Sequence, residues 1–218
     1  MSKKPKTVSL FGTAVDETGE ACVLAKEITV RLTENGFRIA TGGQKAGTME
    51  VATLTAYELA QKQKRKNLEP IGYAMHMWGP MEIGNIQIVS TLSKKIQKLI
   101  DGSFAYICLP GRMGTFLEAI TALHSINIYK NKKLFLPPLV LLDPSEELAK
   151  KILVVCEMFH LLKDNPRLGQ QVFFAKEPEV AYQIVWLFSK IHDGHTLVPE
   201  EQQFLDNCSI TRFSPILR

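Results

Sequence analysis

The stretch FAYICLPGRMGTFLE, residues 104–118, decides the fold that the sequence predicts. Its first part, Phe104–Leu109, is a nearly continuous apolar run of strand length, as expected for a parallel strand that is covered on both faces. Glycines follow this strand directly, and Gly114–Ile128 is the next predicted helix. A buried strand that passes through a glycine-containing turn into a helix is typical of a parallel α/β sheet.

Short apolar runs and longer amphipathic runs alternate in the same way along the rest of the chain. Further strands are expected at Val8–Gly12, Phe37–Ala40, Pro70–Ala74, Ile86–Val89, Leu139–Leu142 and Val172–Ala175, and further helices at Ala21–Asn35, Gly47–Gln61, Leu92–Ile100, Glu146–Phe159 and Glu179–Ile191. The alternation predicts a Rossmann-like α/β fold, in which a doubly wound parallel sheet lies between two layers of helices. We expect a single domain over residues 1–191 and a polar, proline-broken C-terminal tail or docking arm over residues 192–218.

The composition is that of an ordinary globular domain. The 218 residues are 45% hydrophobic, and 26 basic against 22 acidic side chains give a net charge of +4. This charge is far below that of a dedicated nucleic-acid-binding domain, and the basic run Lys62–Lys66 is interpreted as a solvated helix end. A nucleic-acid partner is therefore not expected.

The sequence also predicts a cytoplasmic protein that does not enter a membrane. The longest apolar stretch, Leu134–Leu142, contains two prolines and cannot span a bilayer. The basic N-terminus leads into too few apolar residues for a signal peptide. The four cysteines are scattered without a CxxC pair, and Cys108 and Cys156 lie in apolar runs, which indicates buried thiols in a reducing compartment.

Ligands of open parallel sheets bind beyond the carboxyl ends of the strands, so the residues that follow each strand are the candidates for a site. After the first strand, Gly12 allows a tight turn and Thr13 offers a hydroxyl; the alternative is a plain strand-to-helix turn. The pattern is not GxGxxG, and Phe37–Thr41 carries no acidic residue for a ribose, which disfavours a dinucleotide-dependent dehydrogenase.

A glycine-rich loop, TGGQKAGTME at Thr41–Glu50, follows the second predicted strand. Glycines that open a helix expose backbone N–H groups at its positive end, and such a loop holds a phosphate. The loop has no Gly-Lys-Ser/Thr sequence, so it is not a Walker loop. The alternative is a turn that only requires glycine for its backbone.

The junction Pro110–Glu118 combines glycines, a helix N-terminus and two charged side chains. We expect an anion site here, with Arg112 adding positive charge and Glu118 on the first turn of the helix, close to a bound sugar phosphate. The alternative is structural, because Thr115-x-x-Glu118 also fits a capping box.

These features together resemble the LONELY GUY (LOG) family of phosphoribohydrolases, which are often labelled lysine decarboxylases. The third junction is similar to the family signature PGGxGTxxE, and the order of strands and the glycine-rich loop agree over residues 7–190. Within that group the chain looks closer to the core domain of the bacterial pyrimidine/purine nucleotide 5′-monophosphate nucleosidases. Thr41-Gly42, Met49-Glu50, the basic stretch Lys62–Lys66 and Asn85 have counterparts there.

The resemblance implies hydrolysis of the N-glycosidic bond of a nucleoside 5′-monophosphate such as AMP, giving free base and ribose 5-phosphate. It implies no cofactor and no metal, and a homodimer whose sites take residues from both subunits. The signature glutamate matches Glu118, and counting back from Pro110 places Lys95 where the family has its catalytic arginine. The implied nucleotide-binding positions are Gly12, Thr13, Gly42, Gly43, Gly47, Thr48, Met49, Gly111, Gly114 and Thr115.

The chain departs from the family at two site positions. Lys95 keeps a positive charge but loses the planar fork of a guanidinium. Arg112 replaces the second signature glycine, and if that position has a positive φ the side chain costs roughly 1 kcal/mol or more. Arg112 could instead supply the missing guanidinium, so we count Glu118, Lys95 and Arg112 as the candidate catalytic residues.

These residue types suit the implied chemistry. Breaking an N-glycosidic bond builds positive charge on the ribose, which a carboxylate stabilises while it orients or deprotonates the attacking water. The departures at Lys95 and Arg112 keep a second hypothesis open: a non-catalytic nucleotide-binding module that acts as a sensor or regulator. Met75–Trp78 either covers a nucleobase or packs against a partner, and His192 and His195 are interpreted as surface side chains rather than metal ligands.

Overall fold

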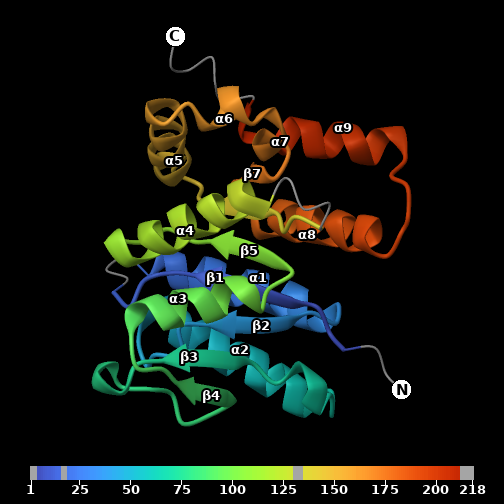
Figure 1. Cartoon of the computed structure of the whole chain (residues 1–218). Helices are drawn as coiled ribbons and strands as arrows, with labels where there is room; N and C mark the ends of the chain where they lie inside the picture. Colours follow the sequence, from blue (N-terminus) through green and yellow to red (C-terminus); the bar gives the residue numbers. More distant parts are fainter. Residues whose placement is uncertain (1–3, 16–18, 130–134, 212–218) are drawn as a thin grey trace.

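The computed structural model describes residues 4–15, 19–129 and 135–211. In this part of the chain, seven strands form one sheet in the order β4-β3-β2-β1-β5-β6-β7, and every adjacent pair is parallel (Figure 1). The strands are β1 (Thr7–Phe11), β2 (Arg38–Thr41), β3 (Ile71–Ala74), β4 (Asn85–Ile88), β5 (Ala105–Cys108), β6 (Leu139–Leu142) and β7 (Val172–Ala175). The predicted α/β fold with a parallel, doubly wound sheet is confirmed.

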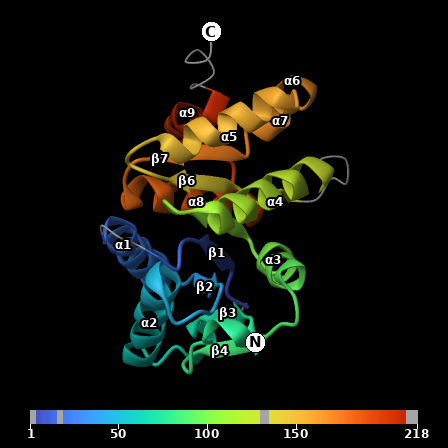
Figure 2. The ribbon, with the colours of Figure 1, turned by 90° about the vertical axis from the view of Figure 1, so that its left-hand side faces the viewer.

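Helices cover both faces of the sheet (Figure 2). One layer holds α1 (Glu20–Glu34), α2 (Gly47–Lys62), α8 (Pro178–His192) and α9 (Pro199–Cys208). The other layer holds α3 (Leu92–Asp101), α4 (Met113–Tyr129), α5 (Glu147–Met158), α6 (Leu161–Asp164) and α7 (Pro166–Gly169), and short 3-10 turns lie at Lys66–Leu68 and His76–Trp78. Each strand or helix that the sequence predicted is present, with ends that differ by at most one residue.

The apolar run of β5 shows why the strands of this sheet can be predicted from the sequence. Ala105 and Ile107 pack into the core beneath α1, α2 and α8, whereas Tyr106 and Cys108 pack into the core beneath α3, α4 and α5. All four side chains are buried, so the strand needs apolar residues at successive positions rather than alternate ones.

The order in which the chain adds strands to the sheet changes direction between β1 and β5. From β1 the chain builds outward through β2, β3 and β4 to one edge, and then returns to build β5, β6 and β7 on the other side of β1. The connections after β1 and β5 therefore diverge, and they leave a crevice at the carboxyl ends of these two strands. The sequence-predicted loops after β1 and β5 both lie at this point.

The start of α4 rules out the capping-box alternative for Thr115 and corrects the expected position of Glu118. The helix begins at Met113, and the Phe116 N–H donates to the Arg112 carbonyl at 3.1 Å, so Arg112 takes the capping position. Thr115 is then the third helical residue and cannot form the capping box that was the alternative interpretation. For the same reason, Glu118 lies on the second turn of the helix rather than the first.

Helix α9 was not predicted. It lies beyond residue 191 and packs against the β7 edge of the sheet, where Leu205 is buried in the core and Ser209 forms a bridge with Phe173. None of the helices in the described ranges combines the length and the hydropathy that crossing a bilayer requires. Cys108 and Cys156 are buried free thiols.

Candidate active site at the carboxyl edge of the sheet

The loops after β1, β2 and β5 and the first turns of α2, α3 and α4 enclose a cavity of about 480 Å³. Eight of the predicted site residues lie on its wall: Gly12, Thr13, Met49, Lys95, Arg112, Gly114, Thr115 and Glu118. The wall also contains Gln44, Trp78, Leu92 and Leu117, which the sequence did not assign to a site. Gln44, Trp78 and Leu117 lay in stretches that the sequence singled out, whereas Leu92 lay in a predicted helix that was assigned no role in a site.

The two charged residues deepest in this cavity are Lys95 and Glu118. Lys95 Nζ lies 3.9 Å from Glu118 Oε1, and the two side chains are only 5% and 8% exposed. Each occupies a core-facing position of its helix: Lys95 is one turn before Leu99 on α3, and Glu118 is one turn before Ala122 on α4. The packing of α3 against α4 brings the two charges together.

Burial and mutual attraction shift the pKa values of Glu118 and Lys95 in opposite directions. Burial raises the pKa of the Glu118 carboxyl from 4.5 to about 7, while the positive charge of Lys95 works against the rise. Burial also lowers the pKa of the Lys95 ammonium, and here the Glu118 charge opposes the change. A carboxyl with a pKa near 7 can accept or release a proton at neutral pH, which suits a general base.

An aromatic ring lies over the Lys95 side of the pair. The centroid of the Trp78 ring is 5.6 Å from Lys95 Nζ, within the range of a cation–π interaction. The glycine-rich loop holds the Trp78 segment in place, because the Lys45 N–H donates to the Gly79 carbonyl and the Met81 N–H donates to the Gly43 carbonyl, both at 2.9 Å.

The glycine-rich loop uses several of its own donors within the protein. The Thr48 N–H and hydroxyl both donate to the Thr13 carbonyl, at 3.0 and 3.1 Å, and the Gly43 N–H donates to the Thr41 hydroxyl at 3.1 Å. Gly43 and Gly47 have the positive φ values that glycine tolerates, +63° and +54°. The loop therefore ties β1, α2 and the Trp78 segment together at the wall of the cavity.

The glycines at this site differ in whether the space beside them is filled by a neighbouring side chain or is open. A methyl group at Gly42 would lie 2.7 Å from Lys95 Nζ and overlap Met49 Sδ, so the missing side chain makes room for Lys95. Gly12 and Gly111 likewise accommodate the side chains of Thr48 and Thr115. Gly114 differs, because a methyl group there would meet no protein atom within 4 Å and would extend into open space.

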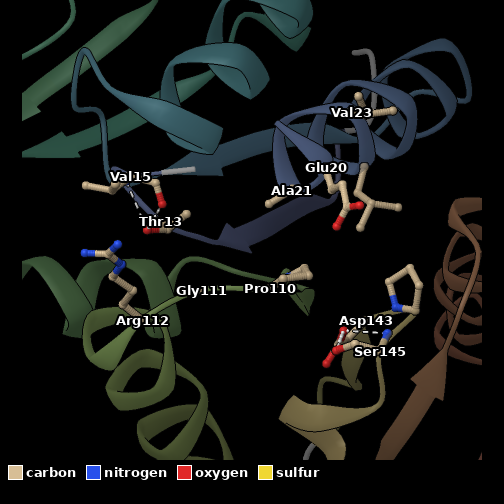
Figure 3. Close-up of a pocket in the computed structure, with 12 residues that line it drawn as sticks. Thr13, Val15, Glu20, Ala21, Val23, Pro110, Gly111, Arg112, Asp143 and Ser145 are labelled. Atoms are coloured by element: carbon tan, nitrogen blue, oxygen red, sulfur yellow. Dashed lines mark hydrogen bonds between the residues drawn. The ribbon is translucent and has the colours of Figure 1, made fainter. Parts of the chain in front are cut away.

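Arg112 lies at the start of α4 and is exposed. Figure 3 shows its side chain reaching toward Thr13 and Val15, which follow β1. The non-glycine residues with a positive φ in the described part of the chain are Lys64, Glu146 and His160. The backbone strain considered for Arg112 therefore does not arise, and its guanidinium stands on the wall of the cavity that contains Glu118.

A second cavity of about 560 Å³, drawn in Figure 3, shares the wall residues Thr13, Val15 and Arg112 with the first. Its walls come from the start of α1 and from the ends of β1, β5 and β6, and Gly111 lies on this wall. Within the described ranges, no group of three or more His, Cys, Asp or Glu side chains is arranged to hold a metal ion.

Comparison with known proteins gives structural neighbours only. No family model and no curated protein matches the sequence. The molybdenum cofactor carrier protein of Chlamydomonas reinhardtii aligns over 85% of this chain and 98% of its own, with a TM-score of 0.58 and 20% identity. The molybdenum cofactor binding protein of the phototrophic bacterium Rippkaea orientalis aligns over 87% and 99%, with a TM-score of 0.57 and 24% identity.

A structural-genomics target, TM1055, aligns over 84% of this chain and 99% of its own, with a TM-score of 0.57 and 15% identity. These likenesses show the fold. They establish the Rossmann-like α/β architecture independently of the sequence patterns, whereas the identities are too low to transfer a function.

Proposed function

We propose that this protein binds a nucleoside 5′-monophosphate in the 480 Å³ cavity and hydrolyses its N-glycosidic bond. The observation that carries the proposal is the buried Lys95–Glu118 pair, whose carboxyl has a pKa of about 7 and faces a cavity at the carboxyl edge of the sheet. The resemblance of Pro110–Glu118 to the LOG signature supports the same assignment.

In this reaction, Glu118 accepts a proton from the attacking water. The water oxygen forms a bond to C1′ of the ribose while the bond from C1′ to the base nitrogen breaks. The base leaves with the bonding electrons and takes up the proton that Glu118 gives back, directly or through water, so the carboxylate is regenerated and the sugar product is ribose 5-phosphate. The negative charge of Glu118 also stabilises the positive charge that develops on the ribose, and Lys95 keeps part of the Glu118 population ionised.

The walls of the cavity indicate how the nucleotide lies. Trp78, Met49 and Leu117 offer an aromatic ring and apolar surface for a base. Arg112 and the open first turn of α4 at Gly114 offer a guanidinium and backbone N–H groups for the phosphate. This orientation places the ribose between them, beside Glu118.

The test is incubation of the protein with a panel of nucleoside 5′-monophosphates, followed by measurement of free base and ribose 5-phosphate. Release of base by the unaltered chain and its loss in Glu118→Gln are the expected results. Glu58→Gln, at an exposed glutamate of α2, is the matched control and keeps the activity. Absence of release from every nucleotide, or full activity of Glu118→Gln, overturns the proposal.

Binding without hydrolysis is the second candidate function. Lys95 presents one compact ammonium where the LOG family has a planar guanidinium, so it cannot engage two oxygens in parallel. A protein with the same fold is named as a carrier of the molybdenum cofactor. Calorimetry that shows tight nucleotide binding with no release of base would favour this candidate.

We also propose that the protein acts as a homodimer. Helices α3 and α4 border a groove of about 390 Å³ in which Leu92, Leu117 and Ile128 are exposed apolar side chains. Sedimentation velocity over a range of concentrations measures the oligomeric state, and Ile128→Glu is expected to shift the protein to a monomer. A monomeric unaltered chain contradicts this proposal.

A further inference from the structure

The proposed binding of a nucleoside monophosphate in the Glu118 cavity leaves the second cavity, of about 560 Å³, without an occupant. It lies at the reversal point of the sheet, where the connections after β1 and β5 diverge and where open α/β sheets bind their ligands. Its volume is itself within the range of small-molecule sites, about 300–1,000 Å³. The protein therefore has room for considerably more than one nucleotide.

The two cavities adjoin and share part of their walls. Thr13, Val15 and Arg112 line both of them. In the orientation proposed above, the ribose faces Glu118 and the 5′-phosphate points toward Arg112. A group attached on the far side of that phosphate would pass Arg112 and enter the second cavity.

Apolar side chains dominate the second cavity. Val15 and Val23 line it with 49% and 56% of their surface exposed (Figure 3), and Leu24, Pro110 and Pro144 also belong to its lining. Exposed apolar side chains that line one concave surface favour a ligand that covers them. An aromatic or heterocyclic ring is the group that such a surface accommodates best.

The charges at this cavity disfavour a second anionic group. Glu20 and Asp143 both contribute carboxylates to its lining. The Asp143 carboxylate accepts hydrogen bonds from the Ser145 N–H at 3.0 Å, the Ser145 hydroxyl at 2.6 Å and the Leu148 N–H at 2.8 Å. It is held in place by the start of α5, and a further phosphate in this cavity would meet its negative charge.

From this geometry we propose that the natural ligand is a nucleotide whose phosphate is linked to a second, uncharged ring-bearing group, as in a dinucleotide. The nucleotide half occupies the Glu118 cavity, the phosphates lie at Arg112, and the second ring occupies the cavity bordered by Val23. This inference rests on the proposed binding of a nucleotide in the Glu118 cavity, and it adds the class of ligand.

Calorimetry with AMP, ADP and diadenosine 5′,5‴-diphosphate tests the inference on the unaltered chain. ADP adds one phosphate to AMP, whereas the dinucleotide adds that phosphate and a second adenosine. The dinucleotide is expected to bind at least about tenfold more tightly than AMP, a gain consistent with burying part of a heterocyclic ring, and ADP no more tightly than AMP. A dinucleotide that binds no more tightly than AMP overturns the inference.

Two valine-to-asparagine variants, at exposed positions of two different helices, test whether the second ring binds in the second cavity. Val23→Asn places an amide in the lining of the second cavity and is expected to remove the gain of the dinucleotide while AMP binding stays within about twofold. Val154→Asn, at an exposed valine of α5, is the control and keeps the gain. A gain that survives in Val23→Asn contradicts the placement, and the ligand series on the unaltered chain decides the question even if that variant fails to fold.

The same measurements separate this inference from the proposed hydrolysis. Tight binding of the dinucleotide without release of base from any ligand upholds the ligand class and overturns the hydrolase. Binding and hydrolysis of AMP without a gain from the second adenosine uphold the hydrolase and overturn the ligand class. Failure of both AMP and the dinucleotide to bind overturns both.

Discussion

The ammonium of Lys95 lies 3.9 Å from a carboxylate oxygen of Glu118, and neighbouring helices hold both groups away from water. Burial alone would drive both groups toward their neutral forms, whereas their attraction favours both charges. The carboxyl reaches a pKa of about 7 as a result. The pair is therefore a proton-accepting group whose state changes at neutral pH, and this property is directly testable.

Activity should depend on pH through this pair. If Glu118 is the base, kcat/KM for AMP rises with pH as the carboxyl loses its proton around pH 7. Lys95 lowers the pKa of Glu118, so Lys95→Met is expected to move the rising limb to higher pH and to reduce the plateau. A pH profile of kcat/KM for both proteins measures this, and an unchanged midpoint in Lys95→Met contradicts the coupling.

Stability should depend on pH in the direction opposite to that of a surface carboxylate. The pKa of Glu118 is higher in the folded state than in the unfolded state. The stabilisation of the folded state by the protonated Glu118 carboxyl is therefore fully present below about pH 4.5 and is lost as the pH rises through about 7. The change in the pKa of Glu118 from 4.5 to about 7 corresponds to roughly 3 kcal/mol in the free energy of unfolding.

Glu118→Gln removes this titration. Urea denaturation of both proteins between pH 4.5 and 8 should show the variant gaining stability relative to the unaltered chain as the pH rises, by roughly that amount. Glu58→Gln serves as the control. A difference in free energy of unfolding that stays constant across this range would show that Glu118 does not titrate there.

The fold could be predicted because its signals are local. Each strand buried on both faces is a short apolar run, and each covering helix has an amphipathic period, as β5 and α3 show. Helix α9 gave no such signal, since only Leu205 of its residues is buried. Its position depends on contacts with β7, far away in the sequence.

The candidate site could be predicted in part of its residues but not in its geometry. Spacing alone located Glu118 after a buried strand, and the family resemblance located Lys95. The distance between them depends on how α3 packs on α4, and the pKa of Glu118 depends on burial, so neither is visible in the sequence. Leu92 and Leu117 were missed because they look like ordinary helix-face side chains.

Asp143 should matter for stability rather than catalysis. Its buried carboxylate accepts three hydrogen bonds from Ser145 and Leu148 and so fixes the start of α5. Asp143→Ala leaves these donors without an acceptor and is expected to cost roughly 2–3 kcal/mol, measured by urea denaturation. Asp143→Asn keeps one amide oxygen as an acceptor and should cost less. Equal stability of all three proteins would contradict this role.

Two glycines of the site should respond in opposite ways to the same change. Gly42→Ala places a methyl group against Lys95 Nζ and Met49 Sδ, which is expected to cost roughly 1–3 kcal/mol and to displace the ammonium from Glu118. Gly114→Ala meets no protein atom within 4 Å and removes a glycine from a helix, so the fold should be unaffected or stabilised by up to about 1 kcal/mol.

Gly114→Ala should weaken binding of AMP even though it leaves the fold unaffected or more stable. If the phosphate lies against the open first turn of α4, the methyl group of Gly114→Ala occupies its place, and AMP affinity should fall by about tenfold or more while thermal stability is kept. Calorimetry with AMP and a thermal melt of the same sample measure the two effects. Unchanged affinity in Gly114→Ala would show that the phosphate binds elsewhere in the cavity, because no protein contact depends on the absence of a side chain at this position.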